Sequence, residues 1–168
     1  MQAKARREAI LNILSTSPEA VSASALAAQF SVSRQVIVGD IALLRAGGAD
    51  ISATPRGYVF RHNVSGVIYK IATRHNSDQT EAELNAIVDQ GCTVIDVIVE
   101  HPIYGQLTGP LDLSNRYDVS QFMLRSAETQ PLSILTEGIH LHTLSCPDEA
   151  AFTRVQSALR ALGVLLEG

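Results

Sequence analysis

The first 60 residues constrain the fold most, because their apolar residues and helix caps mark three short helices in close succession. Apolar residues at helical spacing predict the first helix over about residues 5–15. Ser22 is a good N-cap for a second helix over residues 23–29, and Ser33 for a third that runs to about Arg45. Two short helices joined by three or four residues, the second capped by serine, form the helix-turn-helix pattern.

The start of the third helix carries residues suited to reading DNA. In a helix-turn-helix, the N-terminal residues of the second helix reach base edges in the major groove. Arg34 can donate two hydrogen bonds to guanine, Gln35 can pair with adenine, and Ser33 can bond a phosphate. Val38 and Gly39, one turn further on, are small enough to let the helix lie close to the groove floor.

A predicted hairpin follows the third helix. Gly47-Gly48 ends that helix, because glycine tolerates a left-handed backbone at a helix end. The segment Ile51–Phe60 then predicts two short strands on either side of Pro55-Arg56-Gly57. Such a hairpin is the wing of a winged helix-turn-helix, and Arg56 at its tip suits contact with a phosphate or the minor groove. The alternative is a structural three-helix module that happens to end in a hairpin.

The distribution of charge supports a boundary near residue 61. The net charge of −4 is unusual for a DNA-binding protein as a whole. Residues 1–61, however, hold seven basic and four acidic residues, whereas residues 62–168 hold six and thirteen. A basic N-terminal unit can face phosphate while an acidic unit stays in solvent. We therefore expect a DNA-binding domain over residues 1–61 and a second domain over residues 66–168.

Composition excludes several other classes of protein. Hydrophobic residues make up 46% and charged residues 18% of the chain, which is typical of a globular protein. No apolar run approaches the ~20 residues of a membrane helix, and no secretory segment follows the basic start. Cys92 and Cys146 are far apart, which indicates neither a disulfide framework nor a cysteine zinc site. A cytoplasmic location is the default expectation.

The second domain mixes strands and helices. Asp78 is expected to cap its first helix, and Gly91 to end it. The pattern predicts strands over residues 67–73, 92–99, 105–113, 139–145 and 164–166, helices over 79–90, 119–127 and 149–162, and a linker over 61–65. The fold class is therefore α+β: an N-terminal winged helix-turn-helix followed by an α/β sandwich with helices on a mostly antiparallel sheet.

Two histidines on one predicted strand are the clearest chemical signal. His140 and His142 are two residues apart, so both project from one face, about 6.5–7 Å apart along the strand. Ile139 and Leu141 are expected on the opposite, buried face. Two neutral imidazoles at this separation can bind one metal ion lying between them. The same pattern is also typical of a solvated sheet face.

His75 and Glu83 are expected near the same end of the sheet. His75 ends the first strand of the domain, and Glu83 lies about two helical turns further on, beside an apolar stripe. An unpaired, partly sheltered carboxylate is unfavourable, and a metal ion would relieve it. The alternative is an ordinary solvated glutamate at a helix margin.

His101 and Tyr104 mark a turn after a buried strand. They stand in the sequence Glu100-His-Pro-Ile-Tyr-Gly105, and strand ends with such residues are suitable places for a ligand pocket. The alternative role for His101 is a hydrogen bond to the backbone of the turn.

Taken in order, these motifs resemble the niacin-responsive repressors of the NiaR type, which join a winged helix to a three-histidine (3H) domain. The resemblance covers nearly the full length. It depends on Ser33-Arg-Gln-Val-Ile-Val38, Asp40-Ile-Ala-Leu-Leu-Arg45, Gly57-Tyr58, His75 with Glu83, Glu100-His-Pro-Ile-Tyr-Gly105 and Gly138-Ile-His-Leu-His142.

The resemblance implies a repressor of NAD-synthesis or niacin-uptake genes, with nicotinic acid as co-repressor. It also implies a transition-metal site, nickel or zinc, formed by His75, Glu83, His140 and His142. We expect a homodimer on a palindromic operator.

The metal is expected to keep positions open for the carboxylate or pyridine nitrogen of nicotinate. His101 and Tyr104 can bond or stack on its ring, and an arginine (Arg74, Arg116 or Arg125) can pair with its carboxylate. Two alternatives remain: a repressor for which the metal ion itself is the signal, and a metalloenzyme fused to a DNA-binding module. No separate general base is convincingly placed for the enzyme.

Overall fold

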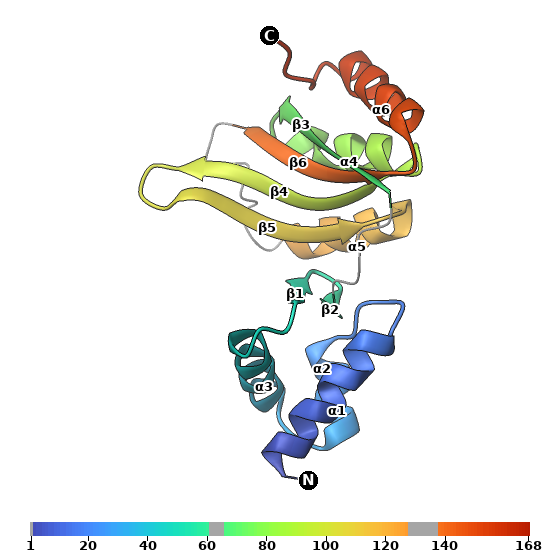
Figure 1. The fold of residues 1–168 in the computed structure, drawn as a ribbon. Helices are drawn as coiled ribbons and strands as arrows, with labels where there is room; N and C mark the ends of the chain where they lie inside the picture. Colours follow the sequence, from blue (N-terminus) through green and yellow to red (C-terminus); the bar gives the residue numbers. More distant parts are fainter. Residues whose placement is uncertain (1, 61–65, 128–137) are drawn as a thin grey trace. The chain divides into compact units, whose positions relative to one another are not determined.

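A computed structural model describes residues 2–60, 66–127 and 138–168. The chain divides into two compact units, Met1–Val64 and Ser65–Gly168 (Figure 1). The predicted linker, residues 61–65, and with it His62, lies outside the described residues. None of the described helices is both long and apolar enough to cross a membrane.

The N-terminal unit is a helix-turn-helix followed by a hairpin. Its elements are α1 (Ala3–Thr16), α2 (Ala23–Phe30), α3 (Arg34–Ala46), β1 (Ile51–Thr54) and β2 (Gly57–Phe60). Both predicted serine caps are present: Ser22 accepts a hydrogen bond from the Ala25 N–H at 3.0 Å, and Ser33 one from the Val36 N–H at 3.2 Å. β1 and β2 pair antiparallel, as expected for the hairpin.

Helix α3 buries fewer of its apolar residues in the core of the unit than the sequence predicts. Ile37, Asp40 and Ile41 are buried, whereas Val36, which the periodicity would place in the apolar stripe, is 38% exposed. Asp40 is the polar member of the buried face, and it accepts a hydrogen bond from Arg6 Nε at 2.5 Å. This ion pair ties the start of α1 to the middle of α3.

The C-terminal unit is a four-stranded sheet with helices on one face (Figure 1). The strand order is β3-β6-β4-β5, and every pairing is antiparallel. The elements are β3 (Val67–Arg74), a 3-10 turn (Ser77–Gln79), α4 (Thr80–Val88), β4 (Thr93–His101), β5 (Gly105–Leu113), α5 (Arg116–Ser126), β6 (Ile139–Cys146) and α6 (Glu149–Ala161). The predicted α+β class is confirmed.

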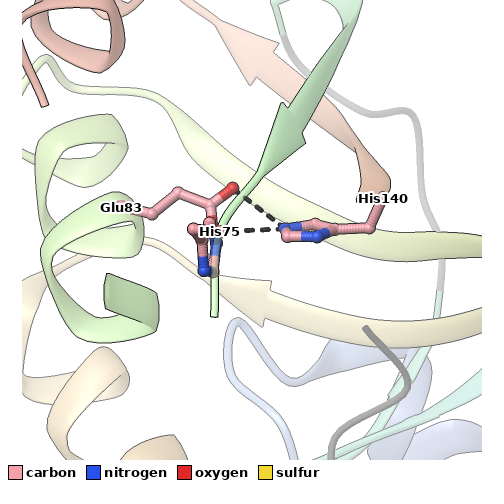
Figure 2. Close-up of side chains that lie close together, drawn as sticks. All are labelled: His75, Glu83 and His140. Atoms are coloured by element: carbon pink, nitrogen blue, oxygen red, sulfur yellow. Dashed lines mark hydrogen bonds and ion pairs between the residues drawn. The ribbon is translucent and has the colours of Figure 1, made fainter. Parts of the chain in front are cut away.

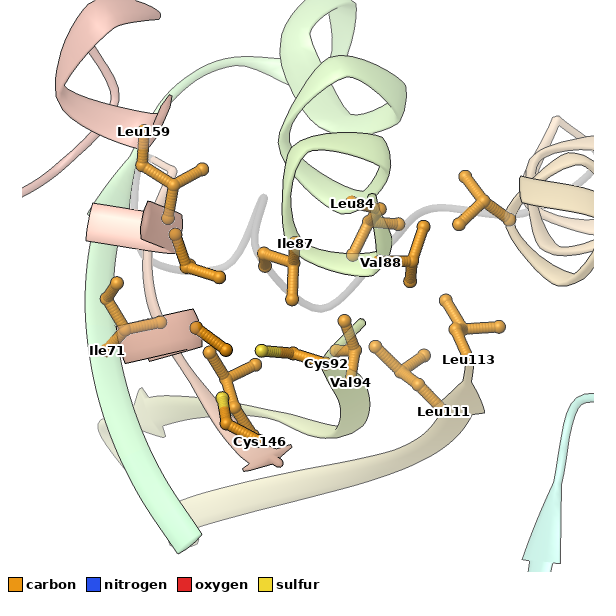
Figure 3. Close-up of a cluster of buried hydrophobic side chains, with 14 of the residues drawn as sticks. Ile71, Leu84, Ile87, Val88, Cys92, Val94, Leu111, Leu113, Cys146 and Leu159 are labelled. Atoms are coloured by element: carbon orange, nitrogen blue, oxygen red, sulfur yellow. The ribbon is translucent and has the colours of Figure 1, made fainter. Parts of the chain in front are cut away.

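The core of this unit lies between the sheet and its helices. Figure 3 shows Leu84, Ile87 and Val88 of α4 facing side chains from the strands. Cys92 and Cys146 are buried in the same core and are not joined in a disulfide. The apolar contacts fix α4 against the sheet, and they thereby fix the position of the Glu83 side chain one residue before Leu84.

Some predicted boundaries of this unit were wrong. Asp78 does not cap α4; it lies in the 3-10 turn, and the capping residue Gln79 makes no side-chain cap. α5 begins at Arg116, three residues earlier than predicted, because Asn115 accepts a hydrogen bond from the Asp118 N–H. The expected last strand is reduced to one bridge between Leu165 and Thr73.

Candidate metal centre

Four polar side chains from three elements meet at one end of the sheet. His75 directly follows β3, Glu83 lies in the first turn of α4, and His140 lies on β6 (Figure 2). His142 lies two residues further along β6. β3 and β6 are neighbours, with Thr73 paired to His140, so the end of β3 lies beside the start of β6. All four side chains are buried, and Glu83 is 0% exposed.

The face of β6 that carries the histidines is the reverse of the one predicted. His140 and His142 are each 3% exposed and lie on the helix-covered face, whereas Ile139 and Leu141 are 40% and 37% exposed. The alternation itself was predicted correctly. Its direction was wrong because we assumed that the apolar pair must lie inside, whereas the imidazoles occupy the inside at this end of the strand.

Glu83 is the common neighbour of the three imidazoles. Its carboxylate contacts His75 Nε2 at very short range. His140 Nε2 lies 3.1 and 3.2 Å from its two oxygens. His142 Nε2 lies 3.0 Å from Oε1, but it lacks the alignment of a hydrogen bond and is buried without a hydrogen-bond partner among the described residues.

The other ring nitrogen of each histidine contacts a backbone carbonyl. His75 Nδ1 lies 2.7 Å from the Asn76 oxygen, and His140 Nδ1 lies 2.9 Å from the Gly138 oxygen. His142 Nδ1 lies 2.7 Å from the Asp96 oxygen, across the β4–β6 pairing. A carbonyl can only accept, so each Nδ1 carries the proton. In the neutral rings all three Nε2 atoms are therefore lone-pair acceptors.

The three Nε2 lone pairs and the buried Glu83 carboxylate are all acceptors, so positive charge is needed between them. Protonation of the imidazole rings can supply part of this positive charge. Burial, the largest effect, lowers the pKa of His75 and of His142, but the contacts with Glu83 outweigh it and leave both above the usual 6.5. Burial likewise raises the pKa of Glu83, and the imidazoles outweigh it and hold that pKa well below 4.5.

A divalent cation would satisfy the same lone pairs without protonating the rings. The atoms offered by His75, Glu83 and His140 lie within 4.8 Å of one another, which suits a single ion. Three imidazole nitrogens and one carboxylate oxygen are donors typical of zinc and nickel sites. The backbone acceptors at Nδ1 are also the partners that orient histidines at metal sites. The residues present therefore fit a transition metal.

Two residues that support the cluster were missed in the sequence. Thr73 is 0% exposed; its hydroxyl donates to Glu83 Oε1 at 2.7 Å and lies 3.0 Å from His140 Nε2. Thr73 lies near the end of β3, two residues before His75, and this spacing is a signal that could have identified it. Gly138 has φ +88°, and a side chain there would overlap the His75 carbonyl. Its own carbonyl contacts both His75 N–H and His140 Nδ1.

The expected effector residues lie outside this cluster. His101 and Tyr104 are at the tip of the β4–β5 hairpin, which extends beyond the start of β6 (Figure 1). His101 Nδ1 accepts the N–H groups of Ile103 and Tyr104, which is the turn-stabilising role considered as the alternative. An open pocket of about 460 Å³ is lined by Glu100, His101, Pro102, Gly105 and Gln106.

The three candidate arginines are exposed. Arg116 makes a two-pronged ion pair with Asp89 at 2.8 and 2.6 Å, so a ligand carboxylate would have to compete for it. Arg74 ends β3 and Arg125 lies in the last turn of α5. These positions do not single out one of the three.

The expected DNA-contacting residues lie where a helix-turn-helix requires them. Ser33, Arg34 and Gln35 are exposed at the start of α3. Val38 is half-buried on the same helix, and Arg56 is half-buried in the turn between β1 and β2.

Together, the two units define a class of protein: a transcription regulator in which a helix-turn-helix unit is followed by a histidine-bearing α+β domain. Residues 6–59 match the HTH domain family, and residues 68–168 match the 3H domain family. The chain is 44% identical to "Probable transcription repressor NiaR" of Thermotoga maritima, over 96% of this chain and 94% of that protein. It is 42% identical to "Transcription repressor NadR" of Bacillus subtilis, over 96% and 93%. The chain belongs to the 3H-domain family of NiaR-type transcription repressors. This membership assigns it to repressors and not to enzymes, as the sequence had indicated.

Proposed function

We propose that this repressor controls genes of NAD synthesis or niacin uptake in the cytoplasm, and that nicotinic acid and a bound metal ion together set its affinity for operator DNA. The observation that carries the proposal is the convergence of three Nε2 lone pairs on the buried carboxylate of Glu83. This cluster lies in the domain that is fused to the DNA-binding unit.

His75, Glu83, His140 and His142 would hold the metal, nickel or zinc. A bound ion of this kind supplies a Lewis acid that accepts a carboxylate or a pyridine nitrogen. The chain's own part is to present neutral imidazoles: the carbonyls of Asn76, Gly138 and Asp96 fix each ring by its Nδ1. Thr73 donates a hydrogen bond to the Glu83 carboxylate.

Nicotinate combines a carboxylate with an aromatic pyridine. It would bind in the pocket at the tip of the β4–β5 hairpin, where His101 is part of the lining and the ring centre of Tyr104 lies 5.0 Å from that of His101. The expected pairing of its carboxylate with Arg116 does not fit this pocket, because Arg116 follows the opposite end of the nine-residue strand β5.

On the DNA side, Ser33, Arg34, Gln35 and Val38 of α3 would enter the major groove, and Arg56 would contact the backbone or the minor groove. We propose that the chain acts as a homodimer, since a two-fold axis matches a palindromic operator. Nicotinate can shift the repressor only if it binds the DNA-competent arrangement of the dimer with a different affinity from the other arrangement.

Gel-shift titrations test this proposal. Metal-loaded and metal-free protein are titrated onto upstream DNA of candidate NAD-synthesis and niacin-uptake genes, each with and without nicotinate. We expect operator affinity to change at least ten-fold with nicotinate in the metal-loaded protein only. Nicotinamide serves as the matched control ligand, because it lacks the carboxylate. Equal affinity with and without nicotinate would overturn the proposed effector.

The second candidate function is a repressor for which the ion is the signal. The observation that favours it is that the four-residue cluster offers a complete donor set without any organic ligand. In the same titrations, such a repressor would change its DNA affinity on metal alone, and nicotinate would add nothing.

A further inference from the structure

Gly39 occupies an unusual place in the recognition helix. It is the sixth residue of the 13-residue helix α3, so it is neither a cap nor a turn residue. Glycine is the poorest helix former after proline. In place of alanine, it lowers the equilibrium constant between helix and unfolded chain about five-fold. A glycine in the middle of an exposed helix therefore needs a reason.

Nothing inside the protein supplies that reason. Apart from its two chain neighbours and the nearby backbone of α3, no atom of the described residues lies within 4 Å of the place that a methyl group on Gly39 would take. Its φ lies outside the left-handed range. Gly57 provides a contrast, since it has φ +132° and a side chain there would overlap the backbone of Val21. Alanine at position 39 would fit and would strengthen the helix.

The position of Gly39 on α3 indicates an external reason. Gln35, Gly39 and Ala42 are separated by four and three residues, so they share one face of the helix, and all three are exposed. The buried residues Ile37 and Ile41 define the opposite side. Gln35 belongs to the first turn of the helix, which reaches base edges in a helix-turn-helix, and Gly39 lies one turn behind it.

We propose that Gly39 is a specificity-determining position at which the backbone of α3 makes close contact with operator DNA. The missing side chain lets the first two turns of the helix lie deeper in the major groove than any other residue would allow. The contact is to a base edge or a thymine methyl group, because these form the groove floor. The inference depends on the family assignment as a repressor and not on nicotinate or the metal.

The experiment compares full-length wild-type protein with Gly39→Ala. The DNA probe is a duplex that the wild-type protein enriches from a random-sequence library, once with metal and nicotinate and once without. We expect Gly39→Ala to bind this duplex about ten-fold more weakly, or to select a different base at one or two positions. Its affinity for a scrambled duplex of equal length, which reports phosphate contacts, should be unchanged.

Hydrogen exchange in residues 34–46 shows that the loss does not come from misfolding. Gly39→Ala should slow exchange there, because alanine stabilises the helix. Ala46→Leu is the matched control: it adds a larger side chain seven residues further along α3, behind the DNA-reading turns, and should retain wild-type affinity and base preference. If Gly39→Ala stabilises α3 and binds the selected duplex with the same affinity and base preference as the wild type, the inference is wrong.

Discussion

Glu83 is the residue on which the candidate metal centre depends. It is fully buried, and its carboxylate is surrounded by three imidazoles and one hydroxyl. An isolated buried carboxylate is strongly unfavourable, so the surrounding donors must be charged or must share a cation with it. The same residue would thus stabilise the domain in two ways, by pairing with protonated rings in the metal-free protein and by binding the ion in the metal-loaded protein.

We predict that His142→Ala weakens metal binding by at least about 100-fold. His142 Nε2 has no hydrogen-bond partner among the described residues, so it is free to bind the ion directly. Loss of a residue that only hydrogen-bonds to a metal ligand lowers metal affinity about 10–100-fold, and loss of a ligand should cost more. Isothermal titration with Zn²⁺ or Ni²⁺ measures the effect. His101→Ala is the control, since His101 bonds only its own turn among the contacts described, and it should bind the ion as the wild type does. Equal affinities for all three proteins would remove His142 from the site.

Metal-free protein should lose stability as the pH rises above about 6.5. The pKa values of His75 and His142 are raised above 6.5 in the folded chain, so their stabilising effect is complete below that pH and is lost as the pH rises through the folded values. The lowered pKa of Glu83 acts in the other sense: its contribution is present above 4.5 and is lost as the pH falls through the folded value.

Bound metal should reverse the first of these trends. Metal binding requires deprotonated ligands, so the metal-loaded protein should gain stability as the pH rises from about 6 to 8. Urea unfolding at a series of pH values, with chelator or with Zn²⁺, measures both curves. If stability depends on pH in the same way with chelator and with Zn²⁺, the histidines do not release protons when the ion binds.

At the scale of elements, the turn between α2 and α3 depends on an unusual backbone conformation. Ser31 has φ +54° and follows directly after α2. We predict that Ser31→Val destabilises the helix-turn-helix by about 1–2 kcal/mol, because a β-branched residue resists the left-handed region. Ser31→Gly should be as stable as the wild type or more so. Thermal unfolding checks this, with the helical residue Ser24 changed to valine as the control, for which a loss of only a few tenths of a kcal/mol is expected.

Local signals in the sequence were sufficient for most elements. Serine caps at Ser22 and Ser33 and the glycines after α3 placed the helix-turn-helix within a few residues, because caps satisfy backbone groups that no other part of the chain can reach. The predicted end of α4 was near Gly91, which indeed has a left-handed backbone. The cap at Asp78 failed because a 3-10 turn precedes α4 and moves its start to Thr80.

The candidate site was only partly predictable. The alternation on β6 predicted that His140 and His142 share a face, but not which face, since that depends on which side α4 packs. Convergence with His75 depends on the pairing of β3 with β6, and the two strands are separated by about 65 residues. Sequence alone could not bring them together without the family resemblance. Gly138 acts through backbone contacts that have no periodicity of their own, whereas the two-residue spacing of Thr73 and His75 could have identified Thr73.

At the scale of the whole molecule, the two units differ in net charge and in the kind of site that they carry. The basic residues 1–61 carry the helix-turn-helix, and the acidic remainder carries the buried cluster. Regulation requires that a ligand bound in the second unit change the DNA affinity of the first, so the coupling free energy must appear in both binding equilibria.

We therefore predict that operator DNA changes the affinity of the metal-loaded protein for nicotinate by the same factor by which nicotinate changes its affinity for DNA. Calorimetric titration of nicotinate with and without operator DNA measures that factor, and an affinity for nicotinate that is the same with and without DNA would contradict the proposal.

The most direct test of the central claim is X-ray absorption spectroscopy of the full-length protein after equilibration with Ni²⁺ or Zn²⁺ and removal of excess metal. We predict one ion per chain, with a coordination sphere of nitrogen and oxygen that includes the outer-shell scattering of three imidazoles. The protein's only sulfur donors of the thiol type, Cys92 and Cys146, are buried in the core and should not contribute. Failure to retain an ion, or a spectrum dominated by sulfur ligands, would contradict the account.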